Sequence, residues 1–210
     1  MRDLIRLLWD KQNQHPGDRQ RLFTVVGEGI DASSALYPGS YVDIAASVAF
    51  PSVTYVDSDA RVAKFFANVG GVDEIIGDHV PPDEERSWQF IGADYTSDLG
   101  LPDQSFDLLI SLYAGFVSES CTRHLRPGGW LLVNPSHGDA AIASIDPRYR
   151  LVGVVASRSG NHTLSARNLE AYLVPKRDVE VTVDLIHESG RGVGYTKSPF
   201  ACLFHLRSAA

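Results

Sequence analysis

Short apolar runs alternate with amphipathic stretches along most of this chain. The runs that predict strands lie at residues 35–37, 52–56, 88–91, 106–112 and 130–133. Between them, apolar side chains recur at helical spacing, as in Val62, Phe65, Phe66 and Val69. Strands that alternate with helices are typical of an α/β domain with a mostly parallel sheet, so this is the fold class that we predict.

The N-terminal part of the chain adds predicted helices, and the C-terminal part adds predicted strands. Apolar spacing predicts a helix around residues 4–8 and another over 22–30, and further strands at 149–156 and 200–206. Within the chain, Ser58 is the expected N-cap of a helix that Gly70-Gly71 ends. Residues 179–185 alternate as a strand does, but a helix from Thr182 to Gly190 fits nearly as well, and the pattern leaves both open.

Composition narrows the class of protein. The chain has 210 residues, 44% hydrophobic and 21% charged, which is typical of one globular domain. A net charge of −7 argues against a general nucleic-acid partner. The longest apolar run, Leu108 to Val117, is shorter than the roughly 20 residues of a membrane span, and residues 1–4 do not resemble a secretory signal. Two cysteines, Cys121 and Cys202, make no disulfide framework and favour a cytoplasmic location.

Two glycine-containing loops compete for the first ligand-binding turn. One is Gly27-Glu28-Gly29, and the other is Pro38-Gly39-Ser40-Tyr41. In nucleotide-binding α/β folds an acidic residue that binds ribose follows the glycines by about 20 positions. Asp57 lies 18 positions after Gly39 and 30 after Gly27, so the spacing favours the Gly39 loop.

Acidic residues then end successive predicted strands. Asp57 offers two acceptor oxygens to paired ribose hydroxyls, and Asp94 could accept from an exocyclic amine such as that of adenine. Tyr95 offers a ring face to the base, and Ser111 begins the floor of the pocket. These residues together predict a nucleoside pocket at the carboxyl ends of the strands.

Two longer motifs carry a resemblance to a known family. Leu101-Pro102-Asp103-Gln104-Ser105-Phe106-Asp107 is similar to the Leu-Pro-x-x-x-Phe-Asp segment before the fourth strand of class I S-adenosylmethionine-dependent methyltransferases. Leu125-Arg126-Pro127-Gly128-Gly129 resembles that family's Leu-Lys-Pro-Gly-Gly turn into the fifth strand. The resemblance implies a three-layer, doubly wound sheet of seven strands, mostly parallel, whose last strand is antiparallel.

The resemblance also implies a cofactor, S-adenosylmethionine, with S-adenosylhomocysteine as the product. The Gly39 loop would hold its methionine part, Asp57 its ribose and Asp94 its adenine. The cofactor-binding set that we predict is Tyr37, Pro38, Gly39, Ser40, Asp57, Ser58, Asp94, Tyr95 and Ser111.

The sequence departs from the family pattern in three places. Tyr41 stands where the family usually has a glycine. The segment from Ser157 to Pro199 replaces a short hairpin between the last two strands and is interpreted as a lid or substrate platform. No Asn/Asp-Pro-Pro-Tyr motif follows the fourth strand, which argues against methylation of an exocyclic base amine.

Methyl transfer depends mainly on holding two reactants together, with a general base as an optional addition. His137 and Tyr113 are the predicted catalytic residues, and Asp139 is a further candidate base. Arg191, Tyr195 and Lys197 could receive an anionic substrate. We predict no metal site, because His162, His187 and His205 lack the spacing of metal ligands.

The sequence thus predicts a single domain. Residues 1–34 form N-terminal helices, 35–156 the cofactor-binding core, 157–199 the inserted segment and 200–210 the last strand. We expect a small-molecule acceptor and no nucleic-acid or membrane partner; a homodimer is left open. The alternative function is a non-catalytic methyltransferase-like module with a degenerate glycine loop. A nicotinamide-dependent oxidoreductase is disfavoured, since Gly-x-Gly-x-x-Gly is absent after the first strand.

Overall fold

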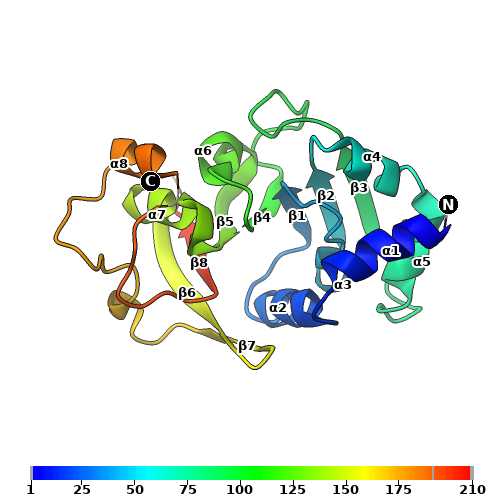
Figure 1. Ribbon diagram of the computed structural model, residues 1–210, viewed down its shortest axis with the longest axis horizontal. Coiled ribbons are helices and arrows are strands. Elements are labelled where there is room, and N and C mark those ends of the chain that lie inside the picture. Colours follow the sequence, from blue (N-terminus) through cyan, green and yellow to red (C-terminus); the bar gives the residue numbers. More distant parts are fainter. Residues whose placement is uncertain (1, 191, 209–210) are drawn as a thin grey trace.

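The computed structural model describes residues 2–190 and 192–208 and is built around one sheet of eight strands (Figure 1). The strands are β1 Ser34–Pro38, β2 Ser52–Val56, β3 Ser87–Ile91, β4 Phe106–Ser111, β5 Leu125–Val133, β6 Tyr149–Arg158, β7 Asn161–Ser165 and β8 Ala201–Leu206. The α-helices are α1 Arg2–Gln12, α2 Asp18–Gly27, α3 Ala46–Ala49, α4 Ala60–Phe66, α5 Val69–Gly77, α6 Val117–Cys121, α7 Asp139–Ile145 and α8 Val183–Ser189. Short 3-10 turns cover Thr122–His124, Pro135–His137 and Leu169–Ala171.

The order of strands in the sheet is β3-β2-β1-β4-β5-β8-β6-β7. Strands β1 to β5 pair in parallel, whereas β8 pairs antiparallel with β5 on one side and β6 on the other. An antiparallel strand between the fifth and sixth strands departs from the 3-2-1-4-5-6 order of dinucleotide-binding domains. The predicted fold class, a mostly parallel doubly wound sheet with an antiparallel last strand, is confirmed.

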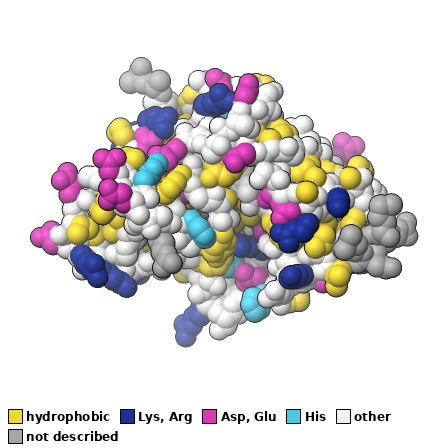
Figure 2. All heavy atoms as spheres, turned by 45° about the horizontal axis from the view of Figure 1, so that its top comes forward, with side chains coloured by type: hydrophobic (Ala, Val, Ile, Leu, Met, Phe, Trp, Pro, Cys, Tyr) yellow, Lys and Arg dark blue, Asp and Glu magenta, His cyan; other side chains and the backbone are white. Residues whose placement is uncertain are grey.

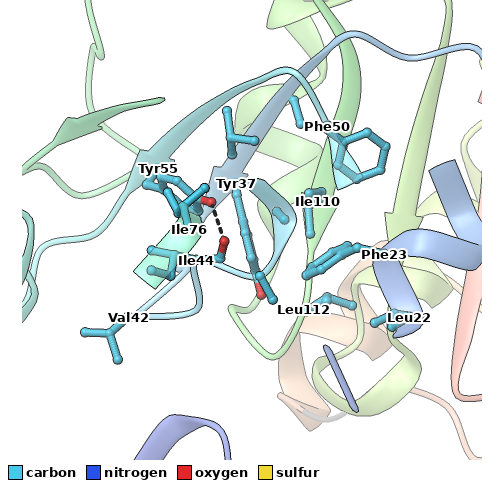
Figure 3. Close-up of a cluster of buried hydrophobic side chains, with 14 of the residues drawn as sticks. Leu22, Phe23, Tyr37, Val42, Ile44, Phe50, Tyr55, Ile76, Ile110 and Leu112 are labelled. Carbon is cyan, nitrogen blue, oxygen red and sulfur yellow. Dashed lines mark hydrogen bonds between the residues drawn. The ribbon is translucent and has the colours of Figure 1, made fainter. Parts of the chain in front are cut away.

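Strands β1, β2 and β4 are buried along nearly their whole length, as strands covered on both faces are. Ala35 and Tyr37 of β1 pack in a cluster with helices α1 to α5, whereas Leu36 packs with α6 and α7. In the first cluster Tyr37 lies against Phe23, with ring centroids 5.9 Å apart (Figure 3). The sheet is therefore the middle of three layers.

The region around Ser58 and Gly70-Gly71 differs from the sequence prediction. The N-cap of α4 is Asp59, whose carboxylate accepts the Arg61 N–H, and not Ser58. The prediction that Gly70-Gly71 ends a helix is wrong, because both glycines lie in the first turn of α5. Asn68 begins that helix by accepting the Gly71 N–H, so the cap decides the boundary and not the low helix propensity of glycine.

The inserted segment contains structure that the sequence pattern did not resolve. Its first part, β7, forms a hairpin with β6 and gives the sheet eight strands where the resemblance implied seven. Its later part settles the open alternative in favour of helix: Thr182 caps α8 by accepting the Leu185 N–H, and Gly190 ends it at a φ of 60°.

The two parts of the inserted segment contact different regions of the fold. Hairpin β6–β7 reaches the N-terminal helix α2, where His162 Nε2 lies 3.1 Å from Asp18 Oδ1 and Arg21 donates to the Gly160 carbonyl. Helix α8 contacts the loop after β4, since the rings of Phe116 and His187 stack with centroids 4.5 Å apart. Among residues 2–190 and 192–208, no helix has the length and apolar character that a membrane crossing needs.

Candidate functional site

The Gly39 loop continues β1 at its carboxyl end. Gly39 has a φ of 63°, and a Cβ built on it would lie 2.3 Å from the Cβ of Ala114 in the loop after β4. Only glycine permits both this conformation and this approach. The competing Gly27-Glu28-Gly29 segment ends helix α2 and follows no strand, so the spacing argument selected the loop that does end a strand.

Tyr41 has an unusual backbone conformation for a residue with a side chain. Its φ is 49°, a left-handed value that a tyrosine seldom adopts. The ring faces the Arg61 guanidinium at 5.9 Å and packs partly buried at the edge of the core. Arg61 in turn pairs with Asp59 at 2.5 Å. Beside the Gly39 loop, the Arg61 guanidinium therefore contacts both the Tyr41 ring and the Asp59 carboxylate.

Asp57 joins the loop after β2 to the Gly39 loop. Its Oδ2 accepts the Tyr41 N–H at 2.8 Å, and its Oδ1 accepts the Asp59 N–H at 2.8 Å. Each oxygen of a carboxylate can accept a second hydrogen bond, so both keep acceptor capacity for a ligand. The half-buried carboxylate is thus fixed between the loops that follow β1 and β2.

The loop after β3 presents Asp94 and Tyr95. Thr96 donates its N–H and hydroxyl to Asp94 Oδ1, and these bonds lower the pKa of this exposed carboxyl, leaving Oδ2 as an acceptor. The Tyr95 hydroxyl donates to the Ala114 carbonyl at 2.8 Å. Tyr95 therefore connects the loop after β3 to the loop after β4.

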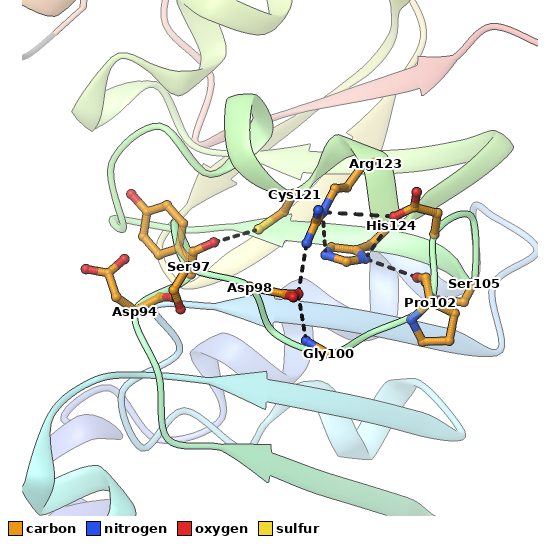
Figure 4. Close-up of polar contacts among 11 residues, drawn as sticks. Asp94, Ser97, Asp98, Gly100, Pro102, Ser105, Cys121, Arg123 and His124 are labelled. Carbon is orange, nitrogen blue, oxygen red and sulfur yellow. Dashed lines mark hydrogen bonds and ion pairs between the residues drawn. The ribbon is translucent and has the colours of Figure 1, made fainter.

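A polar network fixes the rest of that loop, which takes the place of a helix between β3 and β4 (Figure 4). Cys121 lies with its sulfur 3.8 Å from the Tyr95 carbonyl, and Arg123 reaches Asp98 at 3.4 Å. His124 Nδ1 lies 3.0 Å from the Pro102 carbonyl. Because α6 and the turn after it hold the loop at three points, Asp94 and Tyr95 have defined positions.

Ser111 and Asp139 form a buried polar centre below the surface of the site. The Asp139 carboxylate, 1% exposed, accepts hydrogen bonds from the hydroxyls of Ser111 and Ser118, each at 2.5 Å, and from the Ser118 N–H. Burial raises the pKa of Asp139 to about 6, an effect that these hydrogen bonds partly oppose. Asp139 therefore ties β4, α6 and α7 together, and its burial makes it a poor general base.

Replacing Asp139 with asparagine is expected to change how stability depends on pH. The folded-state pKa of about 6 exceeds the ordinary 3.8, so this carboxyl's contribution to stability is complete below pH 3.8 and is lost as pH rises through 6. The difference in unfolding free energy, Asp139→Asn minus native, should therefore rise by roughly 1–3 kcal/mol between about pH 4 and about pH 7. Urea denaturation at both pH values measures it, and a constant difference would contradict the assignment.

Tyr113 and His137 lie on the outer side of this centre. Tyr113 has a φ of 63° and is 46% exposed, and its ring lies edge-on to that of His137 with centroids 6.1 Å apart. Figure 2 turns the top of Figure 1 forward and shows histidine, hydrophobic and charged side chains close together near the middle of this face. The two predicted catalytic residues are thus neighbours.

Hydrogen bonds determine which nitrogen of His137 can act as a base. The Ser136 hydroxyl donates its proton to Asn134 Oδ1 and lies 2.7 Å from His137 Nδ1. Because a hydroxyl has one proton, its oxygen must accept from Nδ1–H in this arrangement. Nε2 then carries the lone pair and is the nitrogen that can take a proton.

The remaining predicted residues have other surroundings. The Tyr37 side chain is buried and donates its hydroxyl to Asp43, so only its backbone is near the loop. Ser40 is buried beside Gly39, whereas Ser58 is exposed. Tyr195 is buried against α7 and α8, Lys197 lies over the Tyr172 ring, and Arg191 is outside the described residues. Among residues 2–190 and 192–208, no group of three or more histidine, cysteine or acidic side chains is arranged to hold a metal ion.

Arg19 is the polar residue near this site that sequence reasoning missed. It lies on α2 with its guanidinium 5.1 Å from the centre of the Tyr113 ring, and its Nε is 3.4 Å from the buried Asp43 carboxylate. An arginine in an amphipathic helix ordinarily faces solvent, and no local pattern distinguishes this one. Its partners come from segments far along the chain.

Comparison with known proteins supports the fold. No protein-family model matches the chain, and no curated protein matches it. A methyltransferase from Geobacter sulfurreducens superposes with a TM-score of 0.51 and 12% identity, over 98% of this chain and 89% of that one. A candidate O-methyltransferase from Klebsiella pneumoniae gives the same TM-score and identity, over 98% and 90%. The N-methyltransferase NodS from Bradyrhizobium japonicum, solved with S-adenosyl-L-homocysteine, gives 0.46 and 14%, over 90% and 85%.

At 12% identity, the similarity to the Geobacter and Klebsiella structures shows the fold alone. Both cover nearly the whole chain. The chain has the Rossmann-like class I methyltransferase fold that the two sequence motifs implied.

Proposed function

We propose that this protein transfers a methyl group from S-adenosylmethionine to a small organic molecule. The observation that carries the proposal is the meeting of the Gly39 loop, Asp57 and the Asp94–Tyr95 loop at the carboxyl ends of β1, β2 and β3. In open α/β sheets this end of the strands, at the switch in strand order between β1 and β4, is where ligands bind.

The residues present fit S-adenosylmethionine. Asp57, with an acceptor site left on each oxygen, would hold the ribose hydroxyls, and Asp94 Oδ2 would accept from the adenine amine. The Gly39 loop would hold the methionine part through its backbone, since Gly39 adds no side chain there. When bound, the cofactor supplies a methyl group already activated by its positively charged sulfur.

His137 and Tyr113 would act on the acceptor. An acceptor hydroxyl or amine becomes a stronger nucleophile as its proton moves to His137 Nε2, the nitrogen that the Ser136 hydroxyl leaves free. Tyr113 would position the acceptor by its exposed ring, beside the Ala114 that packs on Gly39. Holding the two reactants in this way accounts for most of the rate enhancement that methyl transfer needs.

The inserted segment would contribute the remaining wall. Helix α8 and the chain after it contact the loops after β4 and β5, through His187 on Phe116 and through Gly192 against Gly138. We accordingly propose that residues 157–199 form a substrate platform.

Both cysteines are free and buried, which agrees with the cytoplasmic location expected from the sequence.

Calorimetric titration with S-adenosylmethionine and S-adenosylhomocysteine tests the cofactor assignment. We expect micromolar binding of both. If neither binds below millimolar concentration, the cofactor assignment is wrong. Transfer of a labelled methyl group from the cofactor into a metabolite extract then tests turnover and isolates the acceptor.

The variant His137→Ala is expected to lower the rate of that transfer by about 100-fold, the lower range for loss of a general base. Its affinity for S-adenosylhomocysteine should stay within about twofold, because His137 contacts the acceptor side of the site. Added imidazole should restore part of the rate. Ser136→Ala is the matched control, since it removes the hydroxyl that orients the ring, together with its bond to Asn134, but keeps the imidazole, and its loss should be smaller. An unchanged rate in His137→Ala would exclude this role.

One observation favours a second function, that of a non-catalytic module. Tyr41 occupies the loop where the family usually has glycine, and its ring packs beneath Arg61. Binding of S-adenosylhomocysteine without any methyl transfer into the extract would support the module and contradict catalysis.

A further inference from the structure

A cavity lies beside Tyr113. Its volume is about 370 Å³, near the lower end of the range for small-molecule sites. It lies between the connection from α1 to α2 and the start of β8. The lining residues are Lys11, Gln12, Asn13, Gln14, His15, Asp18, Arg19, Tyr113 and Phe200.

The charge of this lining is opposite to that of the chain as a whole. Lys11 and Arg19 are cationic, in a protein with a net charge of −7. The one acidic residue of the lining, Asp18, is already engaged by His162 at 3.1 Å and by Arg21 at 3.7 Å. Across the described part of the chain, Lys11 has no ion-pair partner. Lys11 is therefore the cationic side chain of the lining without an acidic partner, whereas Arg19 pairs with Asp43, which lies outside the lining.

Arg19 has a hydrogen-bond donor without an acceptor. Among residues 2–190 and 192–208 its buried Nη1 has no hydrogen-bond partner, although buried polar groups ordinarily have one. Its Nε is 3.4 Å from Asp43 Oδ2, but Asp43 also accepts from the Tyr37 hydroxyl and the Ala45 N–H. Asp43 therefore fixes the guanidinium without satisfying it.

Aromatic rings fix the same guanidinium from its faces. The Tyr113 ring centre lies 5.1 Å from the Arg19 Cζ atom and the Phe200 ring centre 5.9 Å from it. Tyr113 also contacts His137, with ring centroids 6.1 Å apart. A molecule held at Arg19 would thus extend along Tyr113 toward the nitrogen that takes a proton in the proposed reaction.

We propose that this cavity is a binding subsite for the anionic group of a small organic acceptor, a carboxylate or a phosphate, with Arg19 as the residue that binds it. Both groups accept the paired N–H bonds of a guanidinium. That the anion belongs to the methyl acceptor rests on the proposed function; that the cavity binds an anion does not.

Nuclear magnetic resonance of the native chain with labelled arginine tests the subsite directly. Benzoate, inorganic phosphate and benzamide are titrated separately in the presence of S-adenosylhomocysteine. We expect benzoate or phosphate to bind at millimolar concentration and to shift the Arg19 Nε–H signal, with the tighter one identifying the anionic group. Benzamide, which has the shape of benzoate without its charge, should not shift it. Failure of both anions, or equal binding of benzamide, would overturn the proposal.

A pair of variants adds a second, independent measurement. Arg19→Met, combined with Asp43→Asn so that no buried charge is left unpaired, should weaken anion binding at least about tenfold. Arg6→Met, whose guanidinium pairs with Glu74 and Asp78 and does not line the cavity, should leave anion binding unchanged. An equal affinity in the Arg19 double variant would overturn the assignment even if the native chain binds benzoate.

The outcomes also separate this proposal from the proposed function. If S-adenosylhomocysteine binds and neither anion does, the subsite is wrong and the methyltransferase proposal stands. If an anion binds at Arg19 and S-adenosylhomocysteine does not, the subsite stands and the cofactor proposal fails.

Discussion

Replacing Gly39 with alanine is expected to lower the free energy of unfolding by about 2–4 kcal/mol and to abolish detectable binding of S-adenosylhomocysteine. The new Cβ would lie 2.3 Å from the Ala114 Cβ, a distance at which one of the two loops must move. The φ of 63° adds the cost of a left-handed conformation in a residue with a side chain. Urea denaturation and calorimetric titration measure the two effects.

A matched glycine and a compensating variant make this result specific. Gly70 lies in the first turn of α5 with nothing within 4 Å of a built Cβ, so Gly70→Ala should leave stability unchanged or raise it slightly. Ala114→Gly in the Gly39→Ala background removes the clash but not the backbone cost, and should recover about half of the loss. If Gly39→Ala is as stable as Gly70→Ala, the close approach of the two loops is wrong.

Local pattern was sufficient to predict most of the parallel half of the sheet. The predicted strand 52–56 coincides with β2, whose β-branched and aromatic residues are typical of a strand and end at Asp57. The two motifs that carried the resemblance lie partly at the other end of β4 from the site. There Asp107 accepts from Ser33 and Ser34 and pairs with Arg126 at 2.7 Å. These motifs therefore identify the fold through residues that hold it together.

Features that depend on distant partners could not be predicted. Asp139 is a candidate base by its sequence position, but Ser111 and Ser118, 28 and 21 positions away, enclose it. Strand β7 has a partly polar sequence and is ordered by pairing with β6 and packing on α2. The relation of Arg19 to Tyr113 and Phe200 joins three parts of the chain. In each case the position of the residue depends on partners that are distant in the sequence, and the topology of the sheet brings these partners together.

In the candidate site, too, some features could be predicted from the strand pattern and others could not. Positions at strand ends, such as Asp57 and Asp94, follow from the strand pattern, since the carboxyl ends of neighbouring parallel strands lie at one edge. Directions of side chains do not follow from it. Tyr37, predicted as a cofactor contact, belongs to the face of β1 that packs in the core.

Asp57→Ala is expected to weaken binding of S-adenosylhomocysteine by more than tenfold. Two hydroxyl-to-carboxylate hydrogen bonds would be lost, each worth about 1.5–3 kcal/mol. The same change removes the acceptor for the Tyr41 and Asp59 N–H groups, so the Gly39 loop also loses its attachment to β2. Titration calorimetry of the folded variant, well below its unfolding temperature, measures the affinity.

Two further variants separate ligand contact from loop attachment. Asp57→Asn keeps one acceptor oxygen and should fall between Asp57→Ala and the native chain. Asp59→Asn acts on the neighbouring carboxylate, which caps α4 and pairs with Arg61 but has no predicted contact with the cofactor. It should lower stability while leaving affinity within about twofold. Unchanged affinity in Asp57→Ala would remove Asp57 from the site, and an equal loss in Asp59→Asn would assign the effect to the loops and not to the ribose.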